Sequence, residues 1–343
     1  MKLNHLLSAI AFFGSVCCNA NGQTIELKLA HNSGPGSLFD ICAREYARRV
    51  DAGLGGRIKI SVYSQSKLGS DKEALNKLKK EEIAFALVST VMSSVADEFG
   101  VFEMPFLVHD RDHIKRFRTT LFQEFLEPAA RERGYFLLAM WENGFRHITS
   151  NVRPIETPRD LQGLRLRVPE GDWRAKMFTS YGASPTEMAF DKVYGALNAN
   201  AIDAEENPLA QIDGGKFYLA QKYLTLTRHV YTPAYLVGNP DELAKLPPDV
   251  SNTLISIARE MEDWVLARAE QLDQELLLKM QPFMEINEAD PLAFTLLSLP
   301  IYKKYAETVP RGRLLIKTIF QAAPIAISKI DSPTPQRTAI KAP

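Results

Sequence analysis

Apolar and polar residues alternate or recur with a helical period in the first part of the chain, and this pattern predicts an α/β unit. Residues 25–29 and 57–62 alternate as strands do, and a helix with apolar residues at i, i+3, i+4 and i+7 lies between them. Ser70 and Asp71 then open a second helix. Residues 83–88 form a continuous apolar run, as expected for a strand buried on both faces. This order indicates a sheet that helices cover.

A second unit of the same kind is predicted further along the chain. Residues 135–141 form a buried strand, and residues 230–237 form an extended apolar stretch that we interpret as a return crossing. Over residues 164–168, apolar residues alternate with Arg165 and Arg167. Both arginines are therefore expected to leave this strand on the face opposite its leucines.

A short helix is predicted over residues 191–198. Asp191 can cap its first turn, and Asn198 and Asn200 can end it because asparagine tolerates left-handed backbone. The apolar residues of its predicted buried stripe are Val193, Tyr194 and Leu197.

A much longer helix is predicted over residues 249–280, where the apolar positions keep a helical period. It would be about 48 Å long, which is more than one small unit needs, so we expect it to lie across both units and tie them together. No Gly/Ser-rich linker separates the units, and crossing strands are expected to join them. Residues 322–343 lose periodicity and are rich in Pro, which predicts a weakly ordered tail.

Length and charge narrow the classes of function. The chain has 343 residues, more than the ~250–300 at which single cores stop growing, so two lobes with separate cores are expected. Lys+Arg and Asp+Glu number 41 each, which disfavours a nucleic-acid function because no overall charge attracts the phosphates. The histidines and cysteines show no metal-ligand spacing, and no phosphate loop or nucleophile elbow occurs. We expect no metal, no cofactor and no catalytic residue.

The N-terminus predicts export. A lysine precedes the apolar run of residues 6–16, which has signal-peptide length and is shorter than the ~20 residues of a membrane span. A small-x-small cleavage site follows, so we expect residues 1–22 to be a cleaved signal peptide and the protein to be periplasmic. Acylation of Cys17 or Cys18 and a retained anchor are the alternatives. Cys42 falls on the apolar face of the first helix and is expected in the core.

Three short blocks between residues 141 and 208 carry the residue types that bind a small carboxylate. Arg146 and Arg167 provide planar, always-charged forks, and Asn207 adds an amide donor. The alternative for Arg167 is a surface position with its stem packed and its head in water, as for most arginines on strands.

Two neighbouring glutamates offer a different chemistry. Glu205 and Glu206 could form the acid/base pair of an exported enzyme, but side chains adjacent in sequence rarely face one site and no third group orients them. We favour a structural role, in which Glu206 fixes the loop and pairs with a nearby cation. Phe190 fits a core by its helical spacing, although its place before Asp191 also allows it to line a cleft.

The order and spacing of these blocks resemble the solute receptors of TRAP transporters, the tripartite ATP-independent periplasmic uptake systems. The resemblance extends over residues 25–319. Its most specific parts are Gly-Phe-Arg at 144–146, Gly-Leu-x-Leu-Arg-Val-Pro at 163–169, Gly-Ala-Ser-Pro at 182–185 and Glu-Asn-Pro at 206–208. One departure is Ala204-Glu205, where Gly-Gln is usual.

The resemblance implies an α/β, two-lobed periplasmic-binding-protein fold. Each lobe would hold a mixed sheet, crossing strands would form the hinge, and the long helix would span both lobes. Lobe I is expected to contain residues 23–143 and 233–270, and lobe II residues 144–232 and 271–321.

The resemblance also implies a ligand site. Arg167 would form the paired salt bridge to the ligand carboxylate, with Arg146 and Asn207 as supporting contacts. The other expected ligand contacts are His31, Asn32, Ser89, Thr90 and Phe190.

The function implied is that of a monomeric receptor that closes like a hinged clamp on a small carboxylate. A sugar acid such as a uronate or aldonate would suit the polar residues of lobe I. The loaded receptor would dock on the membrane permease of a TRAP system. The alternatives are a receptor that signals to a membrane sensor, or an exported enzyme that uses Glu205 or Glu206.

Overall fold

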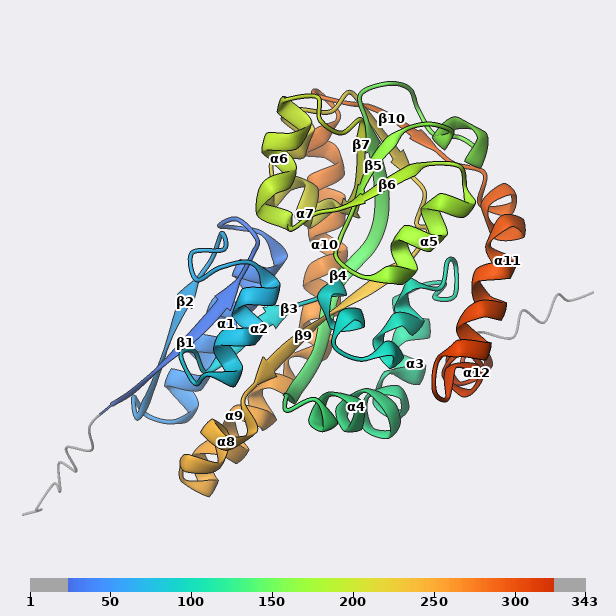
Figure 1. The fold of residues 1–343 in the computed structure, drawn as a ribbon. Coiled ribbons are helices and arrows are strands. Elements are labelled where there is room, and N and C mark those ends of the chain that lie inside the picture. Colours follow the sequence, from blue (N-terminus) through green and yellow to red (C-terminus); the bar gives the residue numbers. More distant parts are fainter. Residues whose placement is uncertain (1–23, 324–343) are drawn as a thin grey trace, which may run out of the picture.

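The computed structural model describes residues 24–323 (Figure 1). The predicted signal peptide, residues 1–22, lies outside the described residues, as does residue 324 onward of the predicted tail. Within the described part, no helix is long and apolar enough to cross a membrane. The chain forms a mixed α/β fold in which helices cover a sheet, as the pattern of apolar residues predicts.

Two parallel sets of strands are joined by two antiparallel strands. The strands are β1 Ile25–His31, β2 Ile58–Tyr63, β3 Phe85–Val88, β4 Phe136–Ser150, β5 Arg165–Val168, β6 Ser184–Glu187, β7 Ala204–Pro208, β8 Tyr223–Leu226, β9 Tyr231–Gly238 and β10 Glu285–Glu288. The first parallel set is β2-β1-β3, and the second is β7-β5-β6. They are connected in the order β3-β9-β4-β7 (Figure 1). The short strand β8 pairs with β4 and β10.

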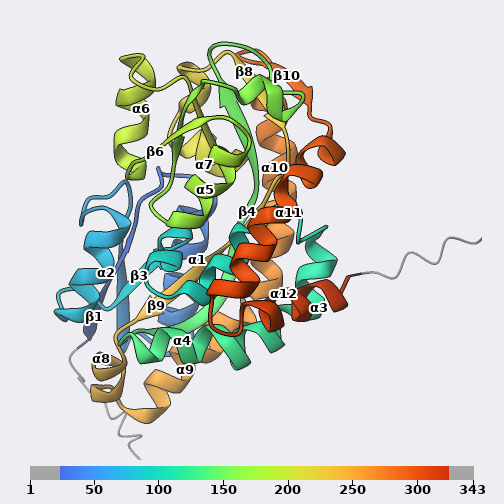
Figure 2. The same ribbon diagram turned by 45° about the vertical axis from the view of Figure 1, so that its right-hand side comes forward.

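The strands β4 and β9 cross between the two sets, as expected for the hinge strands of this fold (Figure 2). The strand β4 does not end at Trp141, where the apolar run ends. Its pairing continues past a register shift between Glu142 and Gly144 and then switches from β9 to β7. Arg146 therefore lies inside a strand and not in the loop that a shorter strand would leave.

The first two helices begin where the sequence predicts. The helix α1 runs over Leu38–Gly53, and its residue Cys42 is buried in the core. The helix α2 runs over Asp71–Lys79. Ser70 caps it, and Glu73 completes a capping box by accepting a hydrogen bond from the backbone of Ser70.

The predicted short helix exists with a different start. The helix α6 runs over Phe190–Asn198 after the extended residue Ala189, so Asp191 lies in the first turn and does not cap it. Tyr194 is 39% exposed and was wrongly placed in the buried stripe, because the buried face of α6 is narrower than predicted. Asn200 adopts a left-handed φ of 52°, as predicted for the end of this helix, whereas Asn198 is still part of α6 and has no positive φ.

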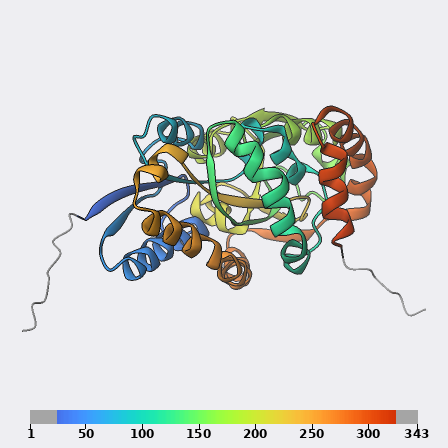
Figure 3. The same cartoon turned by 90° about the horizontal axis from the view of Figure 1, so that it is seen from below.

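Further helices pack around the sheet. They are α3 Arg111–Leu121, α4 Glu127–Glu132, α5 Asp172–Ser180, α7 Leu209–Gly214, α8 Pro240–Lys245, α9 Pro248–Glu260, α10 Glu262–Met280, α11 Pro291–Thr308 and α12 Gly312–Gln321. Other helical segments, which are 3-10 or π in type, are η1 Thr90–Ser94, η2 Asp97–Glu103, η3 Phe122–Leu126, η4 Pro158–Leu161 and η5 Phe217–Leu219. Figure 3 shows α11 and α12 in red on the side opposite the blue strands of the first set.

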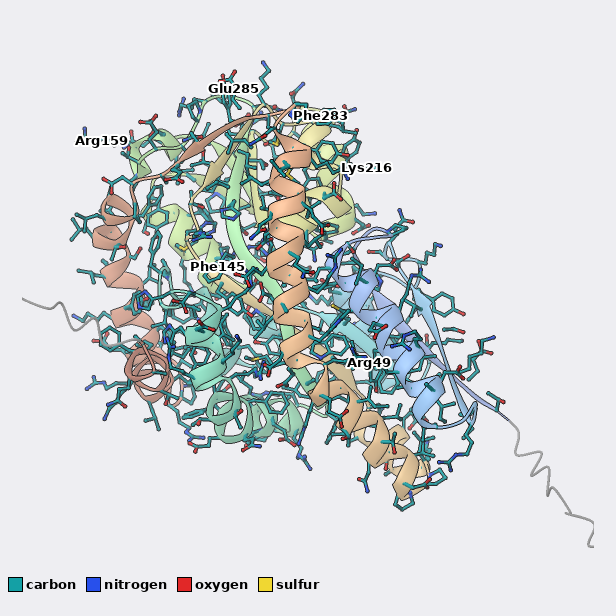
Figure 4. The ribbon with its side chains drawn as sticks, turned by 180° about the vertical axis from the view of Figure 1, so that it is seen from behind. Arg49, Phe145, Arg159, Lys216, Phe283 and Glu285 are labelled. Carbon is teal, nitrogen blue, oxygen red and sulfur yellow. The ribbon has the colours of Figure 1, made fainter. Side chains whose placement is uncertain are left out.

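The long predicted helix is present as α9 and α10, with a bend at Met261, where ψ is −14°. Seen from behind, α10 runs past both halves of the sheet (Figure 4). It packs on β4, on α1 next to the first strand set and on α7 next to the second. Trp141 Nε1 also donates a hydrogen bond to Ala258 O at 2.8 Å, which fixes β4 to α9.

Three clusters of buried apolar side chains hold these layers together. The first joins α1, α9 and α10 to the first strand set and continues to α6 and α7. The second lies around η2, η3 and α3, and the third lies under β5 and α5. The cores of the two halves are therefore not fully separate, because the long helix contributes to a cluster that both halves share.

We expect Leu276→Ala on α10 to lower the free energy of unfolding by about 2–5 kcal/mol, since its 5% exposed side chain fills the shared cluster. Leu278→Ala is the matched control on the same helix. Its side chain is 67% exposed, so its effect should stay within about 0.5 kcal/mol. Urea denaturation of both variants measures the difference, and equal effects would contradict the shared cluster.

Candidate functional site

A cavity lies beyond the carboxyl ends of the two parallel strand sets. It is partly open to solvent. Its walls come from the residues that follow β1 and β3 and start α2, and from residues of β5, β7 and the start of α6. Open α/β sheets bind ligands beyond the carboxyl ends of their strands, so a small-molecule site is expected at this position.

The cavity brings together all but one of the predicted site residues. The predicted residues that line the cavity are Asn32, Ser89, Thr90, Arg146, Arg167, Phe190 and Asn207. His31 does not line it. Its buried side chain lies with Nε2 3.5 Å from Asp40 Oδ1 on α1, because successive residues at the end of β1 face opposite sides of the sheet.

Arg167 is a buried cation that faces the cavity. The side chain leaves β5, and the residue is 3% exposed. Nε and Nη2 donate to Met188 O at 2.9 and 2.6 Å, and no carboxylate of the described residues lies within 4.0 Å. Burial and the nearby charge of Arg146 together lower the pKa of Arg167 to about 10, against the opposing effect of the charges of Glu205, Glu206 and Asp71. Its charge is therefore present at neutral pH and has no carboxylate partner within ion-pair distance among the described residues.

Arg146 lines the cavity, and most of its guanidinium is already bound to other groups of the protein. Its Nε lies 2.5 Å from Glu206 Oε2, and its Nη2 donates to Glu206 Oε1 at 2.8 Å and to Asn207 Oδ1 at 3.0 Å. The guanidinium also bonds the backbone carbonyl of Glu206. The predicted ion pair between Glu206 and a nearby cation is therefore confirmed, and Arg146 is one such cation.

Glu206 holds two more partners that the sequence analysis missed. Arg174 Nη1 lies 2.5 Å from Glu206 Oε2, and His229 Nε2 lies 3.0 Å from the same oxygen. Burial would raise the pKa of Glu206, but the charges of Arg146 and Arg174 hold it well below its usual range. Arg174 also bonds Glu103 on η2, which links α5 to the other half of the molecule. The burial of Arg174 could not be predicted from the sequence, because apolar and polar residues do not form separate faces on α5.

Glu205 and Glu206 are not an acid/base pair. They are neighbours on β7 and reach different partners, since successive side chains on a strand point to opposite faces. Glu205 accepts hydrogen bonds from Thr149 Oγ1 at 2.8 Å and from the Asn207 amide. Burial raises the pKa of Glu205 to about 7. Asn207 is thereby held between Glu205 and Arg146 at the edge of the cavity.

Of the polar cavity residues that follow β1 and β3, some already form hydrogen bonds with other groups of the protein. Ser89 Oγ donates to Pro233 O at 2.6 Å and accepts from Asn143 Nδ2 at 3.1 Å. Asn32 Nδ2 donates to Asp71 Oδ2 at 2.7 Å. Thr90 keeps its hydroxyl without a hydrogen bond to any described residue and lines the cavity.

Asp71, Asn143 and Gln211 line the cavity and were not predicted. The sequence explains Asp71 as an acidic residue in the first turn of α2, and this explanation gives no reason to expect it at the cavity wall as well. Asn143 lies next to the register shift of β4 and accepts from Gln211 Nε2 at 3.0 Å. In residues 24–323, no group of His, Cys, Asp and Glu is placed to hold a metal ion.

The family model described as bacterial extracellular solute-binding protein, family 7, matches residues 29–308. A solute-binding protein of Verminephrobacter eiseniae is 30% identical over 84% of this chain and 86% of its own length. The 2,3-diketo-L-gulonate-binding periplasmic protein of Escherichia coli is 25% identical over 93% of this chain and 99% of its own length.

Solved structures have the same fold. A TRAP periplasmic solute-binding protein of Bordetella, whose density was interpreted as pantoate, has a TM-score of 0.83 at 30% identity and covers 88% of this chain and 100% of its own. The sugar acid binding protein of Advenella mimigardefordensis with galactonate has a TM-score of 0.83 at 25% identity, covering 88% and 99%. A TRAP protein of Sulfurospirillum deleyianum with succinate has a TM-score of 0.82 at 26% identity, covering 87% and 99%.

We expect Glu206→Gln to lower the free energy of unfolding by about 3–5 kcal/mol, because Arg146 and Arg174 would stay buried with less negative charge. Glu205→Gln is the matched neighbour and should cost much less, since its partners are neutral. Because the pKa of Glu205 is raised in the folded protein, its carboxyl group is protonated between about pH 4.5 and pH 7 when folded and ionised when unfolded. The free energy of unfolding of the wild type therefore falls as the pH rises through this range. Glu205→Gln should therefore compare more favourably with wild type at pH 8 than at pH 5 in denaturant titrations.

Proposed function

The chain belongs to the bacterial extracellular solute-binding proteins of family 7, the periplasmic receptors of TRAP transporters, and on this basis we propose that Arg167 anchors the carboxylate of a hydroxylated organic acid. The family binds solutes and does not catalyse reactions. The observation that carries the proposal is the buried guanidinium of Arg167, which faces the cavity without a carboxylate partner among the described residues.

A buried cation without a counter-ion is unfavourable, and a ligand carboxylate would supply the missing charge. Met188 O accepts from Nε and Nη2 of Arg167, whereas Nη1 donates to no described residue. The orientation of the fork is thus fixed before the ligand arrives. A carboxylate would then bind by short, charge-assisted hydrogen bonds in a site from which most water is excluded.

We assign the two halves as lobes of a clamp, with residues 23–143 and 233–270 in lobe I and residues 144–232 and 271–321 in lobe II. The cavity takes its walls from both assigned lobes. The lobes also touch beside it, where a Cβ at Gly171 would lie 2.5 Å from Ser93 Oγ. A ligand that contacts both walls would favour this closed arrangement over an open one.

The proposal includes export and a membrane partner. Relatives in this family are periplasmic, and residues 1–22 have the pattern of a cleaved signal peptide. We propose that the monomeric receptor carries its ligand to the permease of a TRAP system, which would recognise the closed form. Membership of the family supports this partner, since TRAP uptake depends on such a receptor.

The ligand class follows from the lining of the cavity. Thr90 presents a hydroxyl without a partner among the described residues, and the amides of Asn32 and Asn207 line the same cavity, while a single arginine without a paired carboxylate suits one ligand carboxylate. Pantoate and galactonate, found with two of the similar structures, are hydroxylated monocarboxylates. Succinate, found with a third, shows that the fold also serves dicarboxylates. We therefore propose a sugar acid or a related hydroxy acid for this chain.

In a thermal-shift screen of the purified protein, we expect D-erythronate, D-galactonate or another hydroxylated monocarboxylate to raise the melting temperature. The reason is that a ligand bound to the native state stabilises it in proportion to the logarithm of its concentration over Kd. Neutral sugars and amines should have no effect because they leave Arg167 unpaired. Stabilisation by neutral sugars alone would contradict the arginine anchor.

Arg167→Ala should weaken binding of the acid identified in that screen by about 2–5 kcal/mol in calorimetry, because the carboxylate would be desolvated without its partner. Arg167→Lys should also lose affinity, since an ammonium cannot form two parallel bonds. Arg165→Ala is the matched control on the same strand. Arg165 is exposed and bonded to Asp203, so near wild-type affinity is expected. Wild-type affinity in both Arg167 variants would contradict the proposal.

A further inference from the structure

We propose that the outer face of α11, together with basic residues of α11 and α12, binds the surface of a membrane that contains anionic lipids. This face is separate from the ligand site, since no residue of α11 or α12 lines the cavity. It combines a row of exposed leucines with a cluster of cations that begins where the row ends. The two helices form the outer edge of the molecule, opposite the first strand set (Figure 3).

The exposed leucines of α11 lie on one side of the helix. Leu292, Leu296 and Leu299 follow one another at i, i+4 and i+7, and they are 66%, 61% and 59% exposed. Leu297 is also exposed and widens this row, and we call the four residues the leucine face. Residues 291–302 contain no charged side chain. Single exposed leucines are ordinary on a protein surface, but a contiguous apolar patch marks a contact with a partner.

The opposite side of α11 fixes the helix to the protein. Phe294, Ile301 and Tyr305 are buried in two of the apolar clusters. The buried hydroxyl of Ser298 forms a hydrogen bond with the hydroxyl of Tyr181 on the segment that follows α5. The leucine face is therefore presented by a firmly packed helix, and it can contact a partner without any loss of packing inside the protein.

Positive charge gathers at the end of the leucine face. Lys303 continues the row four residues after its last leucine, and Lys304 is its exposed neighbour. On α12, which packs on α11, Arg313 and Lys317 are exposed at i and i+4 and therefore share one side. Residues 291–323 contain five cations and one acid, so this part of a chain with no net charge is basic.

An apolar row beside exposed cations is the arrangement by which helices bind an anionic membrane. The apolar side chains enter the boundary between headgroups and acyl chains, and the cations lie near the lipid phosphates. A protein partner fits less well, because the outside of a single helix offers it no groove. Four leucine side chains also present less area than the ~800 Å² per partner of a stable protein interface, which argues against a second copy.

Binding to lipid would serve the proposed function without depending on the ligand. The membrane concerned is the one that holds the permease, and this part of the inference rests on the proposed export of the protein. A receptor held at that membrane searches for the permease along a surface and not through the whole compartment. Because the leucine face and the cavity share no residue, lipid binding and ligand binding can be measured and altered separately.

The test is flotation of the mature chain, residues 23–343, with protein-free vesicles. One set contains phosphatidylcholine alone, and the other contains phosphatidylglycerol as well. We expect binding to be about tenfold or more tighter with phosphatidylglycerol, and to weaken as salt screens the exposed cations. Leu296→Gln combined with Leu299→Gln should weaken it about tenfold or more, since glutamine suits a helix but removes the apolar area that would be inserted.

Matched controls exist for both parts of the surface. Leu278→Gln replaces a leucine of α10 that is equally exposed and lies outside the leucine face, so vesicle binding should not change. Lys303→Gln with Lys304→Gln should weaken binding about tenfold, whereas Lys28→Gln with Lys59→Gln on the first strand set should not. All these side chains are exposed, so each variant should keep the wild-type melting temperature.

A polarity-sensitive fluorophore on Leu296→Cys gives a second readout. Cys42 is buried, and the other two cysteines lie in the predicted signal peptide, so the label attaches selectively to position 296 in the mature chain. Its emission should shift to the blue when vesicles with phosphatidylglycerol are added. The same label on Leu278→Cys should not shift, because α10 does not belong to the membrane-binding surface.

Each contrary outcome has a definite meaning. Absence of flotation with both vesicle types would overturn the inference and leave a protein as the partner of the leucine face. Loss of binding in the lysine variant but not in the leucine variant would show adsorption by charge alone, which would also overturn it. A label that is already shifted without vesicles would show that a second copy or another part of the chain covers the face. None of these results affects the proposed function, which the thermal-shift screen tests by itself.

Discussion

The charge state of the cavity depends on Glu206. This buried carboxylate holds Arg146, Arg174 and His229 at once, and Glu103 supplies a second negative charge to Arg174. Two arginines and two glutamates therefore balance each other beneath the cavity. Because Arg146 is neutralised in this way, Arg167 is the cation whose charge remains open to a ligand among the residues that line the cavity. Without Glu206, Arg146 would lose its carboxylate partner and become a second unpaired cation at the cavity, and the site would lose its single anchor.

The sheet explains why these groups meet. Two parallel strand sets present their carboxyl ends to the same space, and β4 and β9 carry the chain between them. The register shift of β4 lies just before Arg146, where the strand changes its partner from β9 to β7. Glu142 at this shift is bound by Arg111, which also bonds Asp273 on α10. The crossing strand and the long helix are thus fixed to each other beside the segment on which a hinge motion would act.

The fold was predictable where periodicity or a capping residue decides the structure. The strand patterns, the cap at Ser70 and the long helix were found because neighbouring residues along the chain determine them. The site was predictable where motif residues lie at strand ends, as for Arg167 and Asn207. Arg174 and Asp71 were missed because their roles depend on contacts between distant segments. Arg146 was predicted at the site, but its ion pair with Glu206 was not assigned in advance, because no local sequence pattern shows which distant carboxylate an arginine contacts.

The buried cation of the cavity connects stability with binding. Arg167 keeps its charge without an ion-pair partner among the described residues, which lowers the stability of the closed protein without ligand. A ligand carboxylate that pairs with Arg167 adds most to stability in the closed arrangement, because residues of both halves then enclose it. If the two assigned lobes close on a ligand as we propose, the same unfavourable burial would make closure depend on the ligand. A receptor that must signal its loaded state to a partner needs this dependence, since a site with paired charges would close equally well when empty.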